Sequence, residues 1–189
     1  AYIEYSVVRD FLNERFYVDH NENLLLYTLP DGTISADVGS KEYSIQKVKN
    51  SANYVVLKME GSTAYIALDF VKQYTDMDYR TYENPNSVVI DSVLERSVAT
   101  VKNDTQVRTE DNVKSDILTT VSKKDSVVVI EEKDKWTKVR TADGYIGYVK
   151  QKCLKETETE LVSRNFDEQI YPNISKDYTI NMAWHVVTS

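Results

Sequence analysis

Four short segments between Thr105 and Leu154 carry the clearest structural signal of the chain. They read Thr105-Gln-Val-Arg-Thr109, Val121-Ser-Lys-Lys-Asp125, Trp136-Thr-Lys-Val139 and Gly144-Tyr-Ile-Gly-Tyr-Val149. Successive side chains of an extended strand point to opposite faces. The strand expected from Trp136 to Thr141 therefore places Trp136, Lys138 and Arg140 on one face, and Thr137, Val139 and Thr141 on the other.

These segments resemble the bacterial SH3 domain, a small β-barrel. The family pattern has Val-Arg near the start, a Lys-Gly or Lys-Asp turn, a Trp-x-x-Val strand and a closing Gly-aromatic-x-Gly-aromatic-Val. The sequence departs from it at Thr105-Gln106, where Leu-Asn is usual, and at Asp125, where Gly is usual. The resemblance implies an all-β SH3-like barrel over residues 94–155, with Val139 pointing inward. It also implies a binding or spacing module of extracellular bacterial proteins that act on the cell wall.

Composition and charge limit the classes of partner. The 189 residues carry a net charge of −7, with 23 Lys and Arg against 30 Asp and Glu. An acidic chain does not attract nucleic acid or anionic lipid, since counterion release requires clustered cations. The longest apolar runs fall far below the roughly 20 residues that span a bilayer. We therefore expect neither a nucleic-acid partner nor a membrane-spanning segment, and any signal peptide would precede Ala1.

An internal repeat marks residues 1–92. Tyr2–Tyr27 aligns without a gap on Tyr65–Ile90, and equivalent positions share their character. In each copy an extended Tyr-Ile pair precedes Ser6 or Asp69 as a helix N-cap, followed by apolar residues at helical spacing and by a hairpin. A repeat this regular suggests duplication. The expected fold of residues 1–92 is therefore an α+β duplicated domain of short helices with β-hairpins.

This order of elements resembles the duplicated domain named after the N-terminal region of copper amine oxidases, which is found in many Firmicute surface and spore proteins. The name does not imply copper chemistry here. Copper sites use several imidazole or sulfur ligands, and residues 1–92 hold one histidine, His20, in an expected turn. We expect no metal and no cofactor.

Residues 156–189 begin as an acidic segment, Glu156-Thr-Glu-Thr-Glu160, which predicts a solvated linker. A strand-like apolar run, Tyr178–Thr188, follows it. This run resembles the first barrel strand of glycoside hydrolase family 18, where Ile-Asn-x-Ala-Trp leads into a sugar-cleaving barrel. The resemblance implies that the chain is the non-catalytic front part of a longer wall- or spore-acting enzyme.

No constellation of residues predicts catalysis by the chain itself. Glycoside cleavage requires two carboxyl groups at a fixed separation. The nearest clusters, Asp76 with Asp78 and Glu131-Glu132 with Asp134, fall in expected turns, where solvation is favoured. The single cysteine, Cys153, excludes an intrachain disulfide and has no local histidine partner. Whether an enzyme is attached stays open.

The aromatic residues are the candidate ligand-binding residues. An exposed tyrosine or tryptophan can stack on the apolar face of a sugar ring, although the 14 tyrosines also suit strand packing. We predict a surface cluster of Trp136, Tyr145 and Tyr148, which is either a ligand platform or a contact to a neighbouring domain.

Two functions therefore compete. The first is a non-catalytic wall- or glycan-associated binding or spacer module, whose partner is a cell-wall glycan or peptidoglycan. The second is a surface or spore-coat protein-interaction module that binds another protein. Both place the chain outside the cell or at the wall or spore. The sequence does not determine the oligomeric state.

Overall fold

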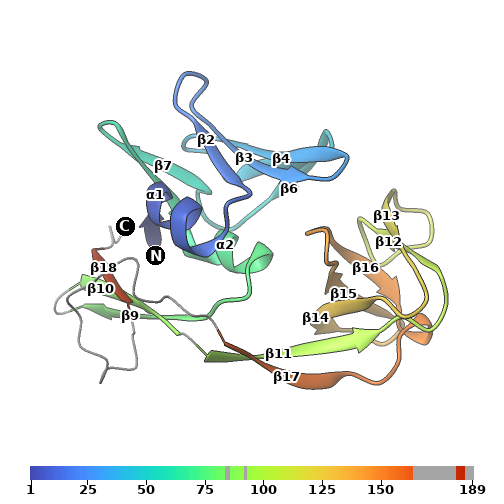
Figure 1. Cartoon of the computed structure of the whole chain (residues 1–189). Helices are drawn as coiled ribbons and strands as arrows, with labels where there is room; N and C mark the ends of the chain where they lie inside the picture. Colours follow the sequence, from blue (N-terminus) through green and yellow to red (C-terminus); the bar gives the residue numbers. More distant parts are fainter. Residues whose placement is uncertain (84–85, 92, 164–181, 186–189) are drawn as a thin grey trace. The chain divides into compact units, whose positions relative to one another are not determined.

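A computed structural model describes residues 1–83, 86–91, 93–163 and 182–185 (Figure 1). The chain divides into two compact units. The first unit comprises Ala1–Ser92 with Ser163–Ser189, and the second comprises Val93–Val162.

The described part of the first unit contains three sheets, ordered β1-β8-β7, β2-β3-β4-β5-β6 and β18-β10-β9. Their strands are β1 (Tyr2–Glu4), β2 (Phe16–Asp19), β3 (Leu24–Leu29), β4 (Gly32–Asp37), β5 (Glu42–Ile45), β6 (Val48–Ser51), β7 (Leu57–Glu60), β8 (Thr63–Ala67), β9 (Tyr79–Glu83), β10 (Asn86–Ile90) and β18 (Met182–His185).

The helices of this unit are short. One segment is α1 (Tyr5–Val7), which continues as the π-helix η1 (Val8–Leu12), and the other is α2 (Leu68–Tyr74). The predicted N-caps are wrong, because Ser6 and Asp69 lie inside the first turns and the N-cap positions belong to Glu4 and Ala67.

The predicted α+β duplicated domain is wrong, because the described residues are mostly strand. Both repeated segments do contain a strand, a helix and a hairpin, but the hairpins enter different sheets. Strands β2 and β3 belong to the five-stranded sheet, whereas β9 and β10 pair with β18. Strands β1 and β8 pair with each other. Similar local sequences therefore do not produce two α+β copies, because the two hairpins have different third strands: β3 pairs with β4, the next strand along the chain, whereas β10 pairs with the distant strand β18.

An aromatic cluster forms the centre of the first unit. Phe70 of α2 lies 6.3 Å from Phe16, 5.2 Å from Tyr43 and 5.3 Å from Tyr74, measured between ring centroids. Tyr27 lies 4.8 Å from Phe16. These edge-on and tilted arrangements are the ones that aromatic quadrupoles favour. The cluster joins the helix α2 to the five-stranded sheet.

The described part of the second unit is one seven-stranded sheet, ordered β13-β12-β16-β15-β14-β11-β17. Its strands are β11 (Val93–Thr100), β12 (Thr105–Arg108), β13 (Ile117–Val121), β14 (Ser126–Glu132), β15 (Trp136–Arg140), β16 (Ile146–Lys150) and β17 (Glu158–Ser163), and the 3-10 helix η2 (Gln151–Cys153) follows β16.

Small apolar side chains from β11 to β16 enter a single core, so the sheet wraps around it. The core residues are Ala99, Val101, Val107, Val121, Val127, Val139, Val149 and Leu154, with Cys153 packed against them. Val139 is buried, which confirms its predicted inward direction. Cys153 has the packing role of a small apolar residue.

Strand β17 begins at Glu158, inside the acidic segment that was expected to be a solvated linker, and lies beside β11. Arg96 of β11 donates to the carboxylate of Glu160 on β17. Most of the run from Tyr178 to Thr188 lies outside the described residues. Its described part, β18, pairs antiparallel with β10.

Candidate functional site

The outer face of β15 and β16 is set by their antiparallel register. Trp136 is paired with Lys150, Lys138 with Tyr148, and Arg140 with Ile146. These residues are half-buried, whereas the residues between them are buried, and Val139 and Val149 belong to the core. The predicted outward direction of Trp136 is confirmed.

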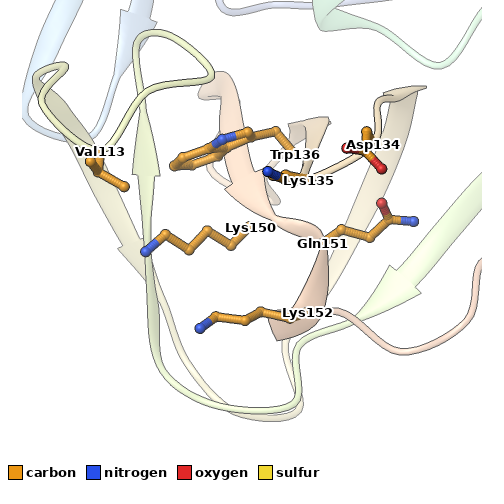
Figure 2. A pocket seen from close by; sticks show the side chains of 7 residues that line it. All are labelled: Val113, Asp134, Lys135, Trp136, Lys150, Gln151 and Lys152. Atoms are coloured by element: carbon orange, nitrogen blue, oxygen red, sulfur yellow. The ribbon is translucent and has the colours of Figure 1, made fainter.

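A groove of about 480 Å³ lies beside Trp136 (Figure 2). We name it the Trp136 groove, and its lining residues are Val113, Asp134, Lys135, Trp136, Lys150, Gln151 and Lys152. Figure 2 shows the indole ring extending to the same side as the side chains of Lys150 and Lys152. The indole and the stems of the two lysines therefore offer apolar surface beside two ammonium groups.

Two polar contacts hold the loops around the groove. Lys133 donates to Asp111 at 3.0 Å, which ties the loop that carries Val113 to the turn that carries Asp134. This hydrogen bond to Asp111 is the main cause that raises the pKa of Lys133. The backbone N–H of Gln151 donates to the carbonyl of Lys135 at 3.0 Å. The groove is thus built on two paired strands and a braced turn.

The charge of the groove is positive. Three lysines and one aspartate line it, although the whole chain carries a net charge of −7. The Lys150 ammonium lies 6.0 Å from the centre of the Trp136 ring, which is the outer limit of a cation–π contact. Within the described ranges, no ion pair is found for Lys135, Lys150 or Lys152.

The three predicted aromatic residues are not brought together. Tyr148 shares the outer face with Trp136 but does not line the groove, and its ring lies 5.0 Å from the Lys133 ammonium. Tyr145 is buried, with 2% of its surface exposed, and its hydroxyl finds no hydrogen-bond partner in the described part of the chain. The structure therefore places Trp136 among lysines rather than among aromatic rings.

A second hollow shares two lining residues, Gln151 and Lys152, with the Trp136 groove. Three lysines and two glutamates are among its lining residues, and those not shared with the groove are Lys102, Glu132, Thr137, Leu154, Lys155, Glu156 and Thr157. It has no aromatic side chain among its lining residues. Its charged residues are of both signs.

Carboxylates of both clusters that were considered as catalytic candidates accept hydrogen bonds from neighbouring groups of the fold. Asp78 accepts from Lys72 at 2.7 Å and from the backbone N–H of Tyr79 at 2.9 Å, and the Lys72 hydrogen bond is the main cause that lowers its pKa. Glu132 accepts from the hydroxyl of Thr157. The described residues contain no group of three or more His, Cys, Asp or Glu side chains arranged to hold a metal ion.

None of the helices in the described residues is both long enough and apolar enough to cross a membrane.

The comparison with protein families matches residues 103–155 to the bacterial SH3 domain. It does not show the resemblances of residues 1–92 to the copper amine oxidase N-terminal domain or of Tyr178–Thr188 to glycoside hydrolase family 18. Neither the curated proteins nor the solved structures gave a match. Bacterial SH3 domains commonly occur in cell-wall-associated or extracellular proteins. The match agrees with the strands and with the core of the second unit, and we conclude that residues 103–155 are a bacterial SH3 domain.

Proposed function

We propose that the chain is a non-catalytic module that binds a cell-wall glycan or peptidoglycan through the Trp136 groove. The observation that carries the proposal is the position of Trp136, which lines a groove on the outer face of the SH3 domain. A flat ring beside a hollow can stack on the apolar face of a sugar, while nearby polar groups bind its substituents.

Replacement of Trp136 by alanine is expected to weaken retention of the whole chain by insoluble Gram-positive wall by about tenfold or more, as for other tryptophans that anchor a binding site. Retention of the parent and of the variant is measured at equal protein concentration. Because the ring is half-buried, we expect a stability loss of about 1 kcal/mol. Melting curves of both proteins are therefore recorded, and binding is compared where both are folded.

Tyr148→Ala is the matched control. It removes a half-buried ring from the same face, yet Tyr148 does not line the groove. This variant should lose a similar amount of stability and keep its retention by the wall. A parent protein that is not retained, or equal retention of the Trp136→Ala variant, would reject the proposal.

A protein-interaction role is the second candidate, because the first unit exposes Tyr17 and Tyr82 on strands. This role predicts that wall retention is absent and that a protein partner is captured through the first unit.

Attachment to a glycoside hydrolase is a separate proposal that rests on Ile180-Asn-Met-Ala-Trp184 alone. The gene sequence around this chain tests it. A following barrel with two acidic catalytic residues supports it, and its absence rejects it.

A further inference from the structure

We infer that the ligand of the Trp136 groove is a phosphodiester-linked sugar or polyol chain, so that the groove recognises the anionic polymer of the wall. This inference rests on the proposed function and names its ligand class. Three observations carry it: the local charge, the kind of cation and the position of the strands in the sheet.

The local charge is opposite to that of the chain. Lys135, Lys150 and Lys152 line the groove, and the described part of the chain supplies no ion pair for any of them. Lys133, which stands next to the groove, is instead paired with Asp111. Three cations that have no carboxylate partner among the described residues, beside an apolar ring, are complementary to a ligand that alternates carbon surface with negative charge.

The kind of cation suits a repeated phosphate rather than a single anion held in one orientation. Arginine binds carboxylates and phosphates through a planar fork with two parallel hydrogen bonds, whereas lysine acts as a point charge that binds phosphate without a fixed orientation. Every cation that lines the groove is a lysine. A lysine ammonium can donate to any free oxygen of a phosphodiester. A chain with repeated phosphates can therefore bind in several registers.

The sheet disfavours an acidic wall peptide as the ligand. Extended peptides commonly bind by adding a strand to a free sheet edge. Strands β15 and β16, which carry Trp136 and Lys150, are inner strands with neighbours on both sides, and the edge strands of the sheet are β13 and β17. Recognition at the groove therefore relies on side chains, which suits a polymer that has no backbone amides to pair.

The distance between the Lys150 ammonium and the Trp136 ring suits a ligand in which a carbon chain is followed by a phosphate. The Lys150 ammonium stands 6.0 Å from the indole centre, and Lys150 is the cross-strand partner of Trp136. A sugar or polyol carbon chain stacked on the ring would hold an adjacent phosphate near this ammonium. Lys152, which extends to the same side in Figure 2, would then lie close to the next phosphate.

The test uses the whole chain and two wall preparations: intact Gram-positive wall, and the same wall stripped of its phosphate polymer by hydrofluoric acid. The parent is expected to bind intact wall at least tenfold more tightly than stripped wall. Its binding to intact wall should also fall steeply between 50 and 200 mM salt, because bound cations are released from a dense polyanion.

The groove variant carries Lys150→Glu with Lys152→Glu, and the control carries Lys123→Glu with Lys124→Glu. Both pairs change the net charge equally, and Lys123 and Lys124 line neither hollow. The groove variant should lose at least tenfold in binding to intact wall, and the control should lose less than threefold. Melting curves show whether each variant is folded. If the groove variant is not folded, the single substitution Lys152→Gln replaces it in the binding test.

The outcomes separate this inference from the proposed function. If the parent binds intact and stripped wall equally and Trp136→Ala weakens this binding, the inference of a phosphate polymer is overturned and peptidoglycan remains as the ligand. Equal losses in the groove variant and the control also overturn it, because a general charge effect would then explain the binding. No retention of the parent on either wall rejects the proposed function itself.

Discussion

Gly147→Ala is expected to destabilise the SH3 domain by about 3 kcal/mol or more, since a new methyl group in a packed interior forces the backbone apart. A Cβ at this position would lie 2.5 Å from the carbonyl oxygen of Arg108, 2.8 Å from Val107 and 2.9 Å from Leu118. The nearest of these atoms belongs to the backbone of β12, which lies next to β16 in the sheet. Calorimetry of the whole chain should show a lower melting temperature of the second unit.

Gly39→Ala is the control for this substitution. Gly39 has a φ of 78° but nothing within 4 Å of its would-be Cβ, so it tests backbone strain without a clash. It should cost about 1 to 2 kcal/mol in the first unit and leave the transition of the second unit unchanged. If the second unit of Gly147→Ala has the same melting temperature as that of the parent, β12 does not approach β16 as closely as described.

Phe70→Ala is expected to destabilise the first unit by about 3 to 5 kcal/mol, because it leaves a cavity in a packed aromatic core. Phe70 is 1% exposed and touches rings from β2, β5 and its own helix. Urea denaturation followed by circular dichroism measures the loss.

Tyr17→Ala is the matched aromatic control. Tyr17 lies on β2, one residue after Phe16, and 52% of its surface is exposed. Surface substitutions of this kind usually change stability by less than about 0.5 kcal/mol. Losses of equal size in Phe70→Ala and Tyr17→Ala would contradict the aromatic core.

The strand of the SH3 domain that carries Trp136 could be predicted because its signal is local. Alternation along Trp136–Arg140 places Val139 inside and Trp136 outside, and the burial pattern of β15 agrees. The period of two in a strand depends only on backbone geometry.

The fold class of residues 1–92 could not be predicted by the same means. Apolar residues at helical spacing do mark α2 and the segment of α1 and η1, but these elements are short. Most of the described chain belongs to strands. Many of them pair with the next strand along the chain, but β1 pairs with β8 and β10 pairs with β18, and these two pairings join distant residues. The likeness of the two repeated segments contains no information about these partners, which is why one hairpin joins β4 and the other joins β18.

The candidate site was only partly visible in the sequence. Tyr145 and Tyr148 are three residues apart, and an odd spacing directs two strand side chains to opposite faces. This parity was the available signal that Tyr145 is buried while Tyr148 is not. Lys150, Lys152 and Val113 gave no such signal, because their approach to Trp136 depends on strand register and on the loop before β13.

The most direct test of the central claim is an NMR titration of the 15N-labelled chain with soluble wall fragments that retain the phosphate polymer. The chain has two tryptophans, so two indole N–H signals are expected, and Trp136→Phe identifies the one from the groove. The account predicts that the Trp136 indole signal shifts or broadens with added fragments, while that of Trp184 stays in place. A Trp136 signal that stays in place while other signals report binding would contradict it.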